Sequence, residues 1–314
     1  MPDGQSENQA VYAQPNSQQP GLGFSQIRVC AATCLNTRSI TDFQYGPVEG
    51  KKTGESALFR QMFVNFKRDD VLVTDSNFEN FRDLATLQSR GVDMVCDKNG
   101  TRTSPFKGTA KSVIEDIQVV LPRPSFNSSR FTRQQWEQLP QTLTVRVIRY
   151  RVAGRKKEIT LVTTLLDRIA YPAKAIAQLY RLRWECELDI RTIKTVMGST
   201  WLSCHTPEML QRELMTYVLA YNVICVTVVE AAKISGYQPR DLSFKNAIES
   251  WLQLGQPEKP EQESRDYAWL LWSIAHAPLR KRPGRVEPRA IKRRSNKYPK
   301  MKKPRDQEKA ALAP

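Results

Sequence analysis

The sequence of 314 residues is long enough to bury a sizeable core, as one large domain or as a domain with an insertion. Hydrophobic residues make up 40% and charged residues 25%, which are ordinary values for a globular protein. The net charge of +16 is concentrated, because residues 280–305 contain 13 basic residues and one acid. This tail indicates a polyanionic partner, with nucleic acid first and an anionic membrane surface second.

Export and membrane insertion are disfavoured by the pattern of apolar residues. Residues 1–19 are polar, so we expect no secretory signal. The longest nearly uncharged stretch, residues 214–229, is short for a membrane span and favours a buried core helix. The six cysteines are scattered without a C-x2-C pair, which favours free thiols over a zinc site. We therefore expect a cytoplasmic protein that binds nucleic acid.

Strands and helices alternate in the first hundred residues. Residues 27–35 and 40–45 are predicted to form paired strands, and residues 54–66 a helix. The short apolar run 71–74 predicts a buried strand that ends at Asp75. A helix over residues 78–90 and a strand over residues 92–96 follow. This alternation predicts a mixed α/β core.

The pattern changes after residue 99. Residues 112–121 are strand-like, and residues 143–147 alternate apolar and polar side chains, which is typical of a half-exposed strand. Residues 100–157 are therefore predicted to form a β-rich insertion with arginines and lysines on its polar face. The chain beyond is predicted to be helical, over residues 173–197, 207–234, 241–254 and 266–276. The proline-broken tail, residues 280–314, is expected to be extended and disordered.

The most informative segment is one predicted helix, where Tyr180, Arg183, Glu187 and Lys194 have the spacing Y-x2-R-x3-E-x6-K. On a continuous helix these four residues fall within an arc of about 60°. They lie beside a seam of apolar residues, which consists of Leu179, Leu182, Cys186, Ile190, Ile193 and Met197. Glu185 and Asp189 fall on other faces. If one carboxylate of this helix binds a metal, the geometry selects Glu187.

Two interpretations of this stripe remain open from the residues alone. One is an ordinary solvated face with ion pairs between residues four apart, such as Arg183 and Glu187. The other is a phosphodiester-cleaving site, in which carboxylates hold two hard divalent cations and nearby cations hold phosphates. Asp75 and the stripe could supply these parts.

The spacing of Tyr180, Arg183, Glu187 and Lys194 resembles the signature of the bacterial DDE transposases of the insertion-sequence 4 family. The run YRLRWECELDIRTIK at residues 180–194 and the run LVTTLLD at residues 161–167 are similar to those of members of this family. So are ENQAVYAQPNSQQPGLGF near the start and RPGRVEPRAIKRR in the tail. The resemblance extends over nearly the whole chain.

The resemblance implies a ribonuclease-H-like α/β fold with a β-rich insertion and a helical carboxyl-terminal part. Asp75 and Glu187 would be catalytic metal ligands for Mg²⁺ or Mn²⁺ in a two-metal site. Tyr180, Arg183 and Lys194 would contact double-stranded DNA, and members act as dimers in a synaptic complex. The predicted limits are residues 1–99 for the first part of the core, 100–157 for the insertion, 158–255 for the second part, 256–279 for a short helical segment and 280–314 for the tail.

Two features concern the ends of the chain. Arg293 and Arg294 in the basic tail are expected to add salt-dependent DNA affinity. In members of the family, the first catalytic aspartate lies on a strand just before the position that corresponds to Met1 here. We therefore expect a core without its first strand. Asp3 is a poor substitute for that aspartate as a metal ligand. The alternative function is therefore a non-catalytic DNA-binding or dimerising chain that inhibits full-length relatives.

Overall fold

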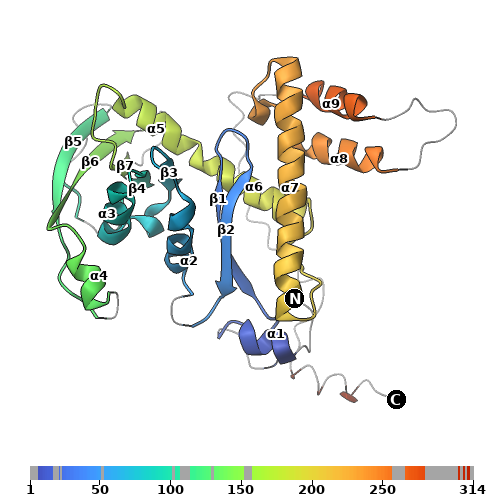
Figure 1. The fold of residues 1–314 in the computed structure, drawn as a ribbon, viewed down its shortest axis with the longest axis horizontal. Coiled ribbons are helices and arrows are strands. Elements are labelled where there is room, and N and C mark those ends of the chain that lie inside the picture. Colours follow the sequence, from blue (N-terminus) through green and yellow to red (C-terminus); the bar gives the residue numbers. More distant parts are fainter. Residues whose placement is uncertain are drawn as a thin grey trace. The chain divides into compact units, whose positions relative to one another are not determined.

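The computed structural model describes residues 6–16, 21, 23–50, 53–100, 103–106, 114–128, 131–151, 158–256 and 266–279, with residues 303–304, 307 and 310–311. Two compact units make up the chain (Figure 1). One unit is residues 56–188, and the other combines residues 1–55 with residues 189–314.

The unit of residues 56–188 is built on a five-stranded sheet with the strand order β3-β4-β7-β6-β5. Strands β3 and β4 are parallel, and the other neighbouring pairs are antiparallel. The strands are β3 (Val71–Thr74), β4 (Asp93–Asp97), β5 (Ile114–Pro122), β6 (Thr142–Arg151) and β7 (Glu158–Thr163). The strands predicted for the insertion, β5 and β6, thus belong to the same sheet as β3 and β4.

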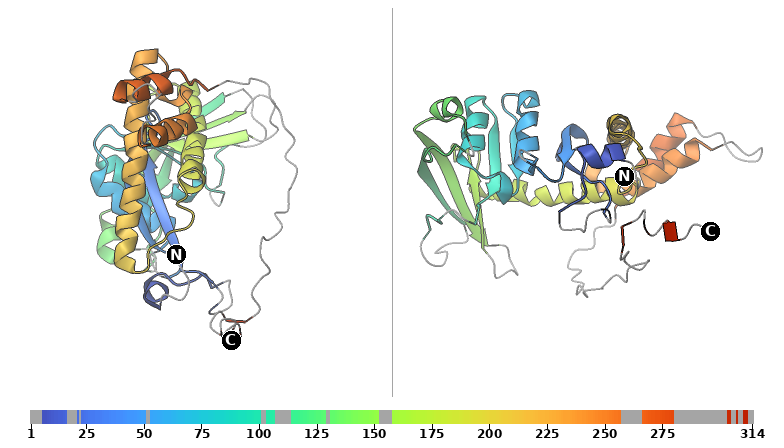
Figure 2. Two further views of the ribbon diagram at one scale, coloured as in Figure 1. Left: turned by 90° about the vertical axis from the view of Figure 1, so that its right-hand side faces the viewer. Right: turned by 90° about the horizontal axis from the view of Figure 1, so that it is seen from below.

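Helices flank this sheet (Figure 2). Helix α5 packs on one face through Ile176 and Ala177, against Val95, Ile148 and Leu161 of the strands. The helical segments of this unit are α2 (Glu55–Met62), η1 (Phe63–Asn65), η2 (Ser76–Phe78), α3 (Phe81–Ser89), α4 (Arg133–Glu137), α5 (Ala173–Arg181) and the first half of α6 (Arg183–Thr195). The order of strands and helices confirms the predicted α/β class.

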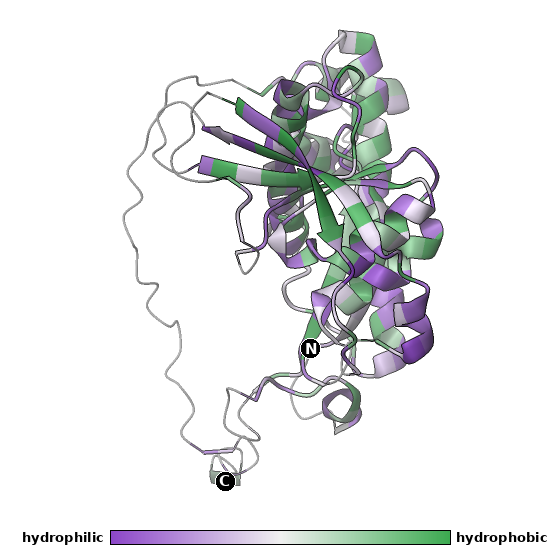
Figure 3. Ribbon diagram, turned by 90° about the vertical axis from the view of Figure 1, so that its left-hand side faces the viewer, coloured by the Kyte–Doolittle hydropathy of each residue, from purple (hydrophilic) through white to green (hydrophobic). Residues whose placement is uncertain are grey.

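The prediction of a half-exposed strand over residues 143–147 was wrong. Strand β6 is buried on both faces, and Arg146 is 0% exposed. The polar side chains are buried because they have partners: Arg146 forms two hydrogen bonds to Asp116 on β5, and Arg149 pairs with Glu115. Bands of hydrophobic and of hydrophilic residues both occur along the strands of this sheet (Figure 3).

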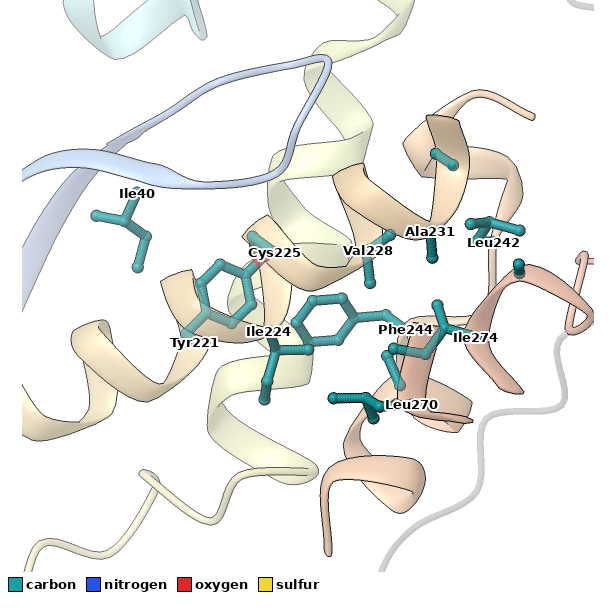
Figure 4. Packing of buried hydrophobic residues seen from close by; sticks show 13 residues of the cluster. Ile40, Tyr221, Ile224, Cys225, Val228, Ala231, Leu242, Phe244, Leu270 and Ile274 are labelled. Carbon is teal, nitrogen blue, oxygen red and sulfur yellow. The ribbon is translucent and has the colours of Figure 1, made fainter. Parts of the chain in front are cut away.

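The second unit joins a β-hairpin to a group of helices. Strand β1 (Ile27–Thr33) pairs with β2 (Ile40–Pro47), as predicted. The helical segments are α1 (Ser6–Val11), α7 (Pro207–Ser235), η3 (Pro239–Asp241), α8 (Phe244–Leu254) and α9 (Tyr267–Ala275). Figure 4 shows their core, in which the ring centroids of Tyr221 and Phe244 lie 5.1 Å apart.

Helix α7 is the long apolar helix predicted from residues 214–229. Of the described helices, it alone is long and apolar enough to cross a membrane by length and composition. Its buried residues, among them Tyr221, Cys225 and Val228, form the centre of the core of this unit. This packing is that of a core helix, in agreement with the prediction.

Candidate active site

The predicted strand of residues 71–74 is observed as β3, and Asp75 follows its last residue. Asp75 keeps an extended backbone with φ −83° and ψ −178°, so the pleat of the strand continues through it. Its carboxylate accepts a hydrogen bond of 2.8 Å from the backbone N–H of Asn77 and caps η2. Asp75 therefore lies at the carboxyl end of a sheet strand, half-buried.

A second aspartate occupies the same position on the neighbouring strand. Thr74 of β3 pairs with Cys96 of the parallel strand β4, and Asp97 is the last residue of β4. Continuing this register brings Asp75 level with Asp97, about 4.8 Å away between strand axes. Asp97 was not singled out from the sequence, although it ends an apolar strand just as Asp75 does. The missing information was that these two strands are parallel neighbours.

Tyr180, Arg183 and Glu187 form a connected set. Arg183 Nη2 lies 2.8 Å from Glu187 Oε1, so the two side chains form an ion pair one helical turn apart. The guanidinium carbon of Arg183 also lies 5.9 Å from the centroid of the Tyr180 ring. Arg183 therefore interacts with both its neighbours in the predicted stripe.

The negative charge of Asp97 acts on Tyr180. The pKa of Tyr180 is raised to about 12, chiefly by burial and then by the negative charge of Asp97. Burial alone lowers the pKa of Arg183, but its hydrogen bond to Glu187 and its contact with Tyr180 raise it above the ordinary value. The charged form of Arg183 is thus favoured, as a phosphate-binding group requires.

The prediction of one continuous helix over residues 173–197 was wrong in one respect. The chain leaves the α-helical pattern at Leu182, between α5 and α6. Here the N–H of Leu182 bonds to the carbonyl of Leu179, and the N–H of Glu185 to that of Leu182, so two bonds span three residues instead of four. Tyr180 therefore stands at the end of α5, while Arg183 and Glu187 stand on α6.

The predicted apolar seam is also only partly buried. Leu179 packs in the core of residues 56–188, and Ile193 packs in the core of the other unit. Leu182 and Ile190, by contrast, are 45% and 42% exposed. The buried residue of α6 is Asp189, whose Oδ2 lies 2.8 Å from Nη2 of Arg240. Asp189 therefore has a structural partner, whereas the side chain of Glu187 is exposed.

The remaining predicted DNA-binding residues are placed as follows. Lys194 is exposed in the last turn of α6. Arg293 and Arg294, like Asp3, lie outside the residues that the structure describes.

Carboxylate oxygens are the donors that Mg²⁺ prefers, and one or two carboxylates with water and substrate phosphates suffice to hold it. The paired strand ends at Asp75 and Asp97 fit this requirement. Within the part of the chain that the structure describes, no three Asp, Glu, His or Cys side chains converge to enclose a metal. Two carboxylates at neighbouring strand ends are a donor set that suits a hydrated divalent cation.

Comparison with known proteins shows the family of the chain. The family "Transposase DDE domain" matches residues 5–223. The transposase InsG of insertion sequence element IS4 from Escherichia coli strain K12 is 25% identical over 310 residues, which cover 95% of this chain and 66% of that protein. The chain thus spans just under two thirds of the relative's length.

Among solved structures, the comparison returned the piggyBac transposase synaptic complex with hairpin DNA. It matches 83% of this chain and 53% of its own, with a TM-score of 0.42 and 10% identity. The family match supports the ribonuclease-H-like core with a helical carboxyl-terminal part that the sequence predicts. The resemblance to the insertion-sequence 4 transposases is confirmed, and the chain belongs to the DDE transposase domain family.

Proposed function

We propose that this chain provides the catalytic domain of a bacterial insertion-sequence transposase, which cleaves the ends of its element and joins them to target DNA with Mg²⁺ or Mn²⁺. The observation that carries this proposal is the connected set of Tyr180, Arg183 and Glu187. An ordinary ion pair on a helix does not require an adjacent tyrosine. In a strand-cleaving site, the arginine and the tyrosine would bind a phosphate, and the neighbouring carboxylate would serve the cleavage.

In this proposal Asp75 and Glu187 hold the metal ions. The ions supply the activation of the attacking oxygen and the stabilisation of the leaving oxygen. Arg183 has donors left for a phosphate after pairing with Glu187, because a guanidinium carries five N–H groups. The Tyr180 hydroxyl holds the DNA backbone beside the reacting phosphate, and the exposed Lys194 also binds the DNA backbone.

The partners follow from the reaction. Strand transfer brings two element ends together, so we propose a dimer in the complex with double-stranded DNA. The site of action is then the bacterial cytoplasm, at the nucleoid. The basic tail with Arg293 and Arg294 adds affinity that does not depend on sequence and falls with rising salt.

The test is end-specific cleavage. The full chain is incubated with Mg²⁺ or Mn²⁺ and linear DNA that carries the sequences flanking its reading frame in the source genome. We expect nicks at the element ends, lost in Glu187→Gln and retained in the matched variant Glu185→Gln on the same helix. Equal cleavage by both variants would reject the role of Glu187.

A second candidate is a non-catalytic chain that binds DNA or full-length relatives and inhibits them. Its support is that both proposed ligands already have partners within the chain, Glu187 with Arg183 and Asp75 with the backbone of Asn77. This candidate predicts DNA binding without nicks under any divalent ion. It also predicts that added chain lowers the cleavage rate of a full-length relative, and that Glu187→Gln inhibits equally well.

A further inference from the structure

Asp97 is placed beside Asp75 by the backbone of the sheet. In a parallel pair, residues in register point to the same face, so the pairing of Val73 with Val95 extends to Asp75 and Asp97. The extended backbone of Asp75 preserves this alternation one residue beyond β3. Two carboxylates therefore lie side by side at the carboxyl ends of two adjacent strands, on one face.

This face is the one on which α5 packs. Val95, two residues before Asp97, lies in the same buried cluster as Ile176 and Ala177 of α5. Tyr180, at the end of α5, packs against that cluster as well. The two carboxylates thus share their face of the sheet with the helix that leads to Arg183 and Glu187.

The buried hydroxyl of Tyr150, on the same face, is an independent sign that a ligand binds there. Asp97 pairs across the sheet with Leu161, and Tyr150 pairs with Ile159, so Tyr150 and Asp97 point to one side. Tyr150 is only 5% exposed, and its hydroxyl has no hydrogen-bond partner among the described residues. Buried polar groups nearly always have a partner, so this hydroxyl has a free hydrogen-bonding position with respect to the described residues.

The negative charge of Asp97 acts on the Tyr150 hydroxyl. Burial raises the pKa of Tyr150, and the negative charge of Asp97 raises it further, while Arg181 acts in the opposite direction. The same charge acts on Tyr180. By the register of the sheet, Asp97 shares its face with Tyr150 and with the neighbouring Asp75, an arrangement in which the two carboxylates would hold a hydrated cation whose water would bond to Tyr150.

We propose that Asp97 is a metal ligand, and that Asp75 and Asp97 together bind one divalent cation. This inference rests on the proposed function for its biological meaning, but the cation site itself can be tested without DNA. It assigns Asp97 a direct contact with the metal, and it assigns the Tyr150 hydroxyl a water molecule of that metal.

The first experiment titrates Mn²⁺ alone into the full chain and follows free Mn²⁺ by electron paramagnetic resonance. We expect Asp97→Asn to weaken the tightest site by roughly tenfold or more, and Asp75→Asn to do the same. The matched control is Asp70→Asn, an exposed aspartate before the other end of β3, which should bind as the wild type does. A folded Asp97→Asn chain whose Mn²⁺ affinity equals that of the wild type overturns the proposal.

A second measurement needs no variant. Fe²⁺ in place of Mg²⁺, with ascorbate and peroxide, releases hydroxyl radicals that cut the backbone next to the bound ion. We expect cuts near Asp75 and Asp97 that excess Mg²⁺ suppresses. Cuts only elsewhere in the chain overturn the proposal, even if Asp97→Asn does not fold.

The two proposals fail in different ways. Mn²⁺ binding that depends on Asp97, in a chain that never nicks DNA, leaves the cation site in place and rejects the catalytic function. End-specific nicking by a chain in which Asp97→Asn binds Mn²⁺ and cleaves normally leaves the function in place and rejects Asp97 as a ligand.

Discussion

Arg183 forms an ion pair with Glu187, one helical turn further along α6, in which Nη2 lies 2.8 Å from Oε1. The guanidinium carbon of Arg183 also lies 5.9 Å from the centroid of the Tyr180 ring, so the arginine contacts both a carboxylate and a phenol. The arginine is half-buried, with 26% of its side chain exposed, whereas 42% of the glutamate side chain is exposed. Glu187 can therefore change partner more readily than Arg183 can move.

The first prediction concerns Arg183 as a phosphate contact. Arg183→Gln should lower the slope of log affinity against log salt by about 0.9, because each phosphate neutralised on duplex DNA releases its counterions. Binding should weaken equally for end-containing and unrelated DNA, since a backbone contact carries no sequence information. Fluorescence anisotropy over a range of salt concentrations gives both values.

The control for this prediction is Lys245→Gln. Lys245 forms an ion pair of the same spacing with Glu249 on α8, at 3.4 Å, and is 75% exposed. Its removal should leave the salt slope unchanged. If Arg183→Gln also leaves the slope unchanged, Arg183 does not contact a phosphate and only pairs with Glu187.

The second prediction separates two acids of one helix by their roles. Asp189→Asn should destabilise residues 1–55 and 189–314 by about 3 kcal/mol, because it breaks a buried pair with Arg240, whose side chain is 15% exposed. Glu187→Gln should change stability by less than about 1 kcal/mol, because its ion pair is partly exposed. Urea unfolding followed by tryptophan fluorescence measures this, since four of the six tryptophans lie in residues 189–314.

Cleavage should show the opposite order. Asp189→Asn should retain nicking at a temperature where it is folded, while Glu187→Gln should lose it by roughly 100-fold or more. Loss of nicking in the folded Asp189→Asn chain, with nicking retained in Glu187→Gln, would exchange the two assignments.

The sequence predicted the elements that depend on local pattern. A short apolar run before an acid was enough to place β3 and Asp75, because strand ends in an α/β core follow from periodicity and burial. The same pattern precedes Asp97, but only the parallel pairing of β3 with β4 makes the two acids neighbours. Sheet order joins segments far apart in the sequence, and periodicity carries no information on it.

Long-range partners also explain the errors. Arg146 was expected on a polar face because apolar and polar residues alternate there. Its burial was missed because its partner Asp116 lies 30 residues away in the sequence, on a strand whose position was unknown. Asp189 was correctly placed off the stripe, but its burial was not predicted, since that depends on Arg240, 51 residues further on. The break at Leu182 has no mark in the sequence, because no proline or glycine stands there.

The third prediction concerns the ionisation of Tyr180. Its pKa of about 12 lies above the ordinary value of 10.0, so difference titration of wild type against Tyr180→Phe should isolate one late tyrosinate step. The folded-state pKa exceeds the unfolded value, so this contribution to stability is complete below pH 10.0 and is lost as the pH rises through about 12. Ultraviolet absorbance of tyrosinate follows the step.

Asp97→Asn should move this step toward lower pH, because it removes a negative charge that disfavours the phenolate. The step should stay above the ordinary value, since burial is the larger cause. A step unchanged in Asp97→Asn would mean that the Asp97 carboxylate does not face Tyr180.

The fourth prediction concerns Arg146, whose guanidinium is fully buried in the sheet. It bonds to both carboxylate oxygens of Asp116, at 2.8 and 2.6 Å, and donates to the backbone carbonyl of Tyr171 over 2.7 Å. Arg146→Met should cost about 3–5 kcal/mol in unfolding free energy, because it leaves Asp116 mostly buried without its main partner. Urea unfolding followed by far-ultraviolet circular dichroism measures the loss.

Arg151→Met is the matched control on the same strand, since Arg151 is 52% exposed in its pair with Glu158 and should cost less than about 1 kcal/mol. The double variant Arg146→Met with Asp116→Leu should recover part of the loss, because no unpaired charge remains. Recovery should be incomplete, since the carbonyl of Tyr171 loses its donor. If Arg146→Met costs no more than Arg151→Met, the buried pair does not hold β5 and β6 together, and the stability of this sheet comes from apolar packing alone.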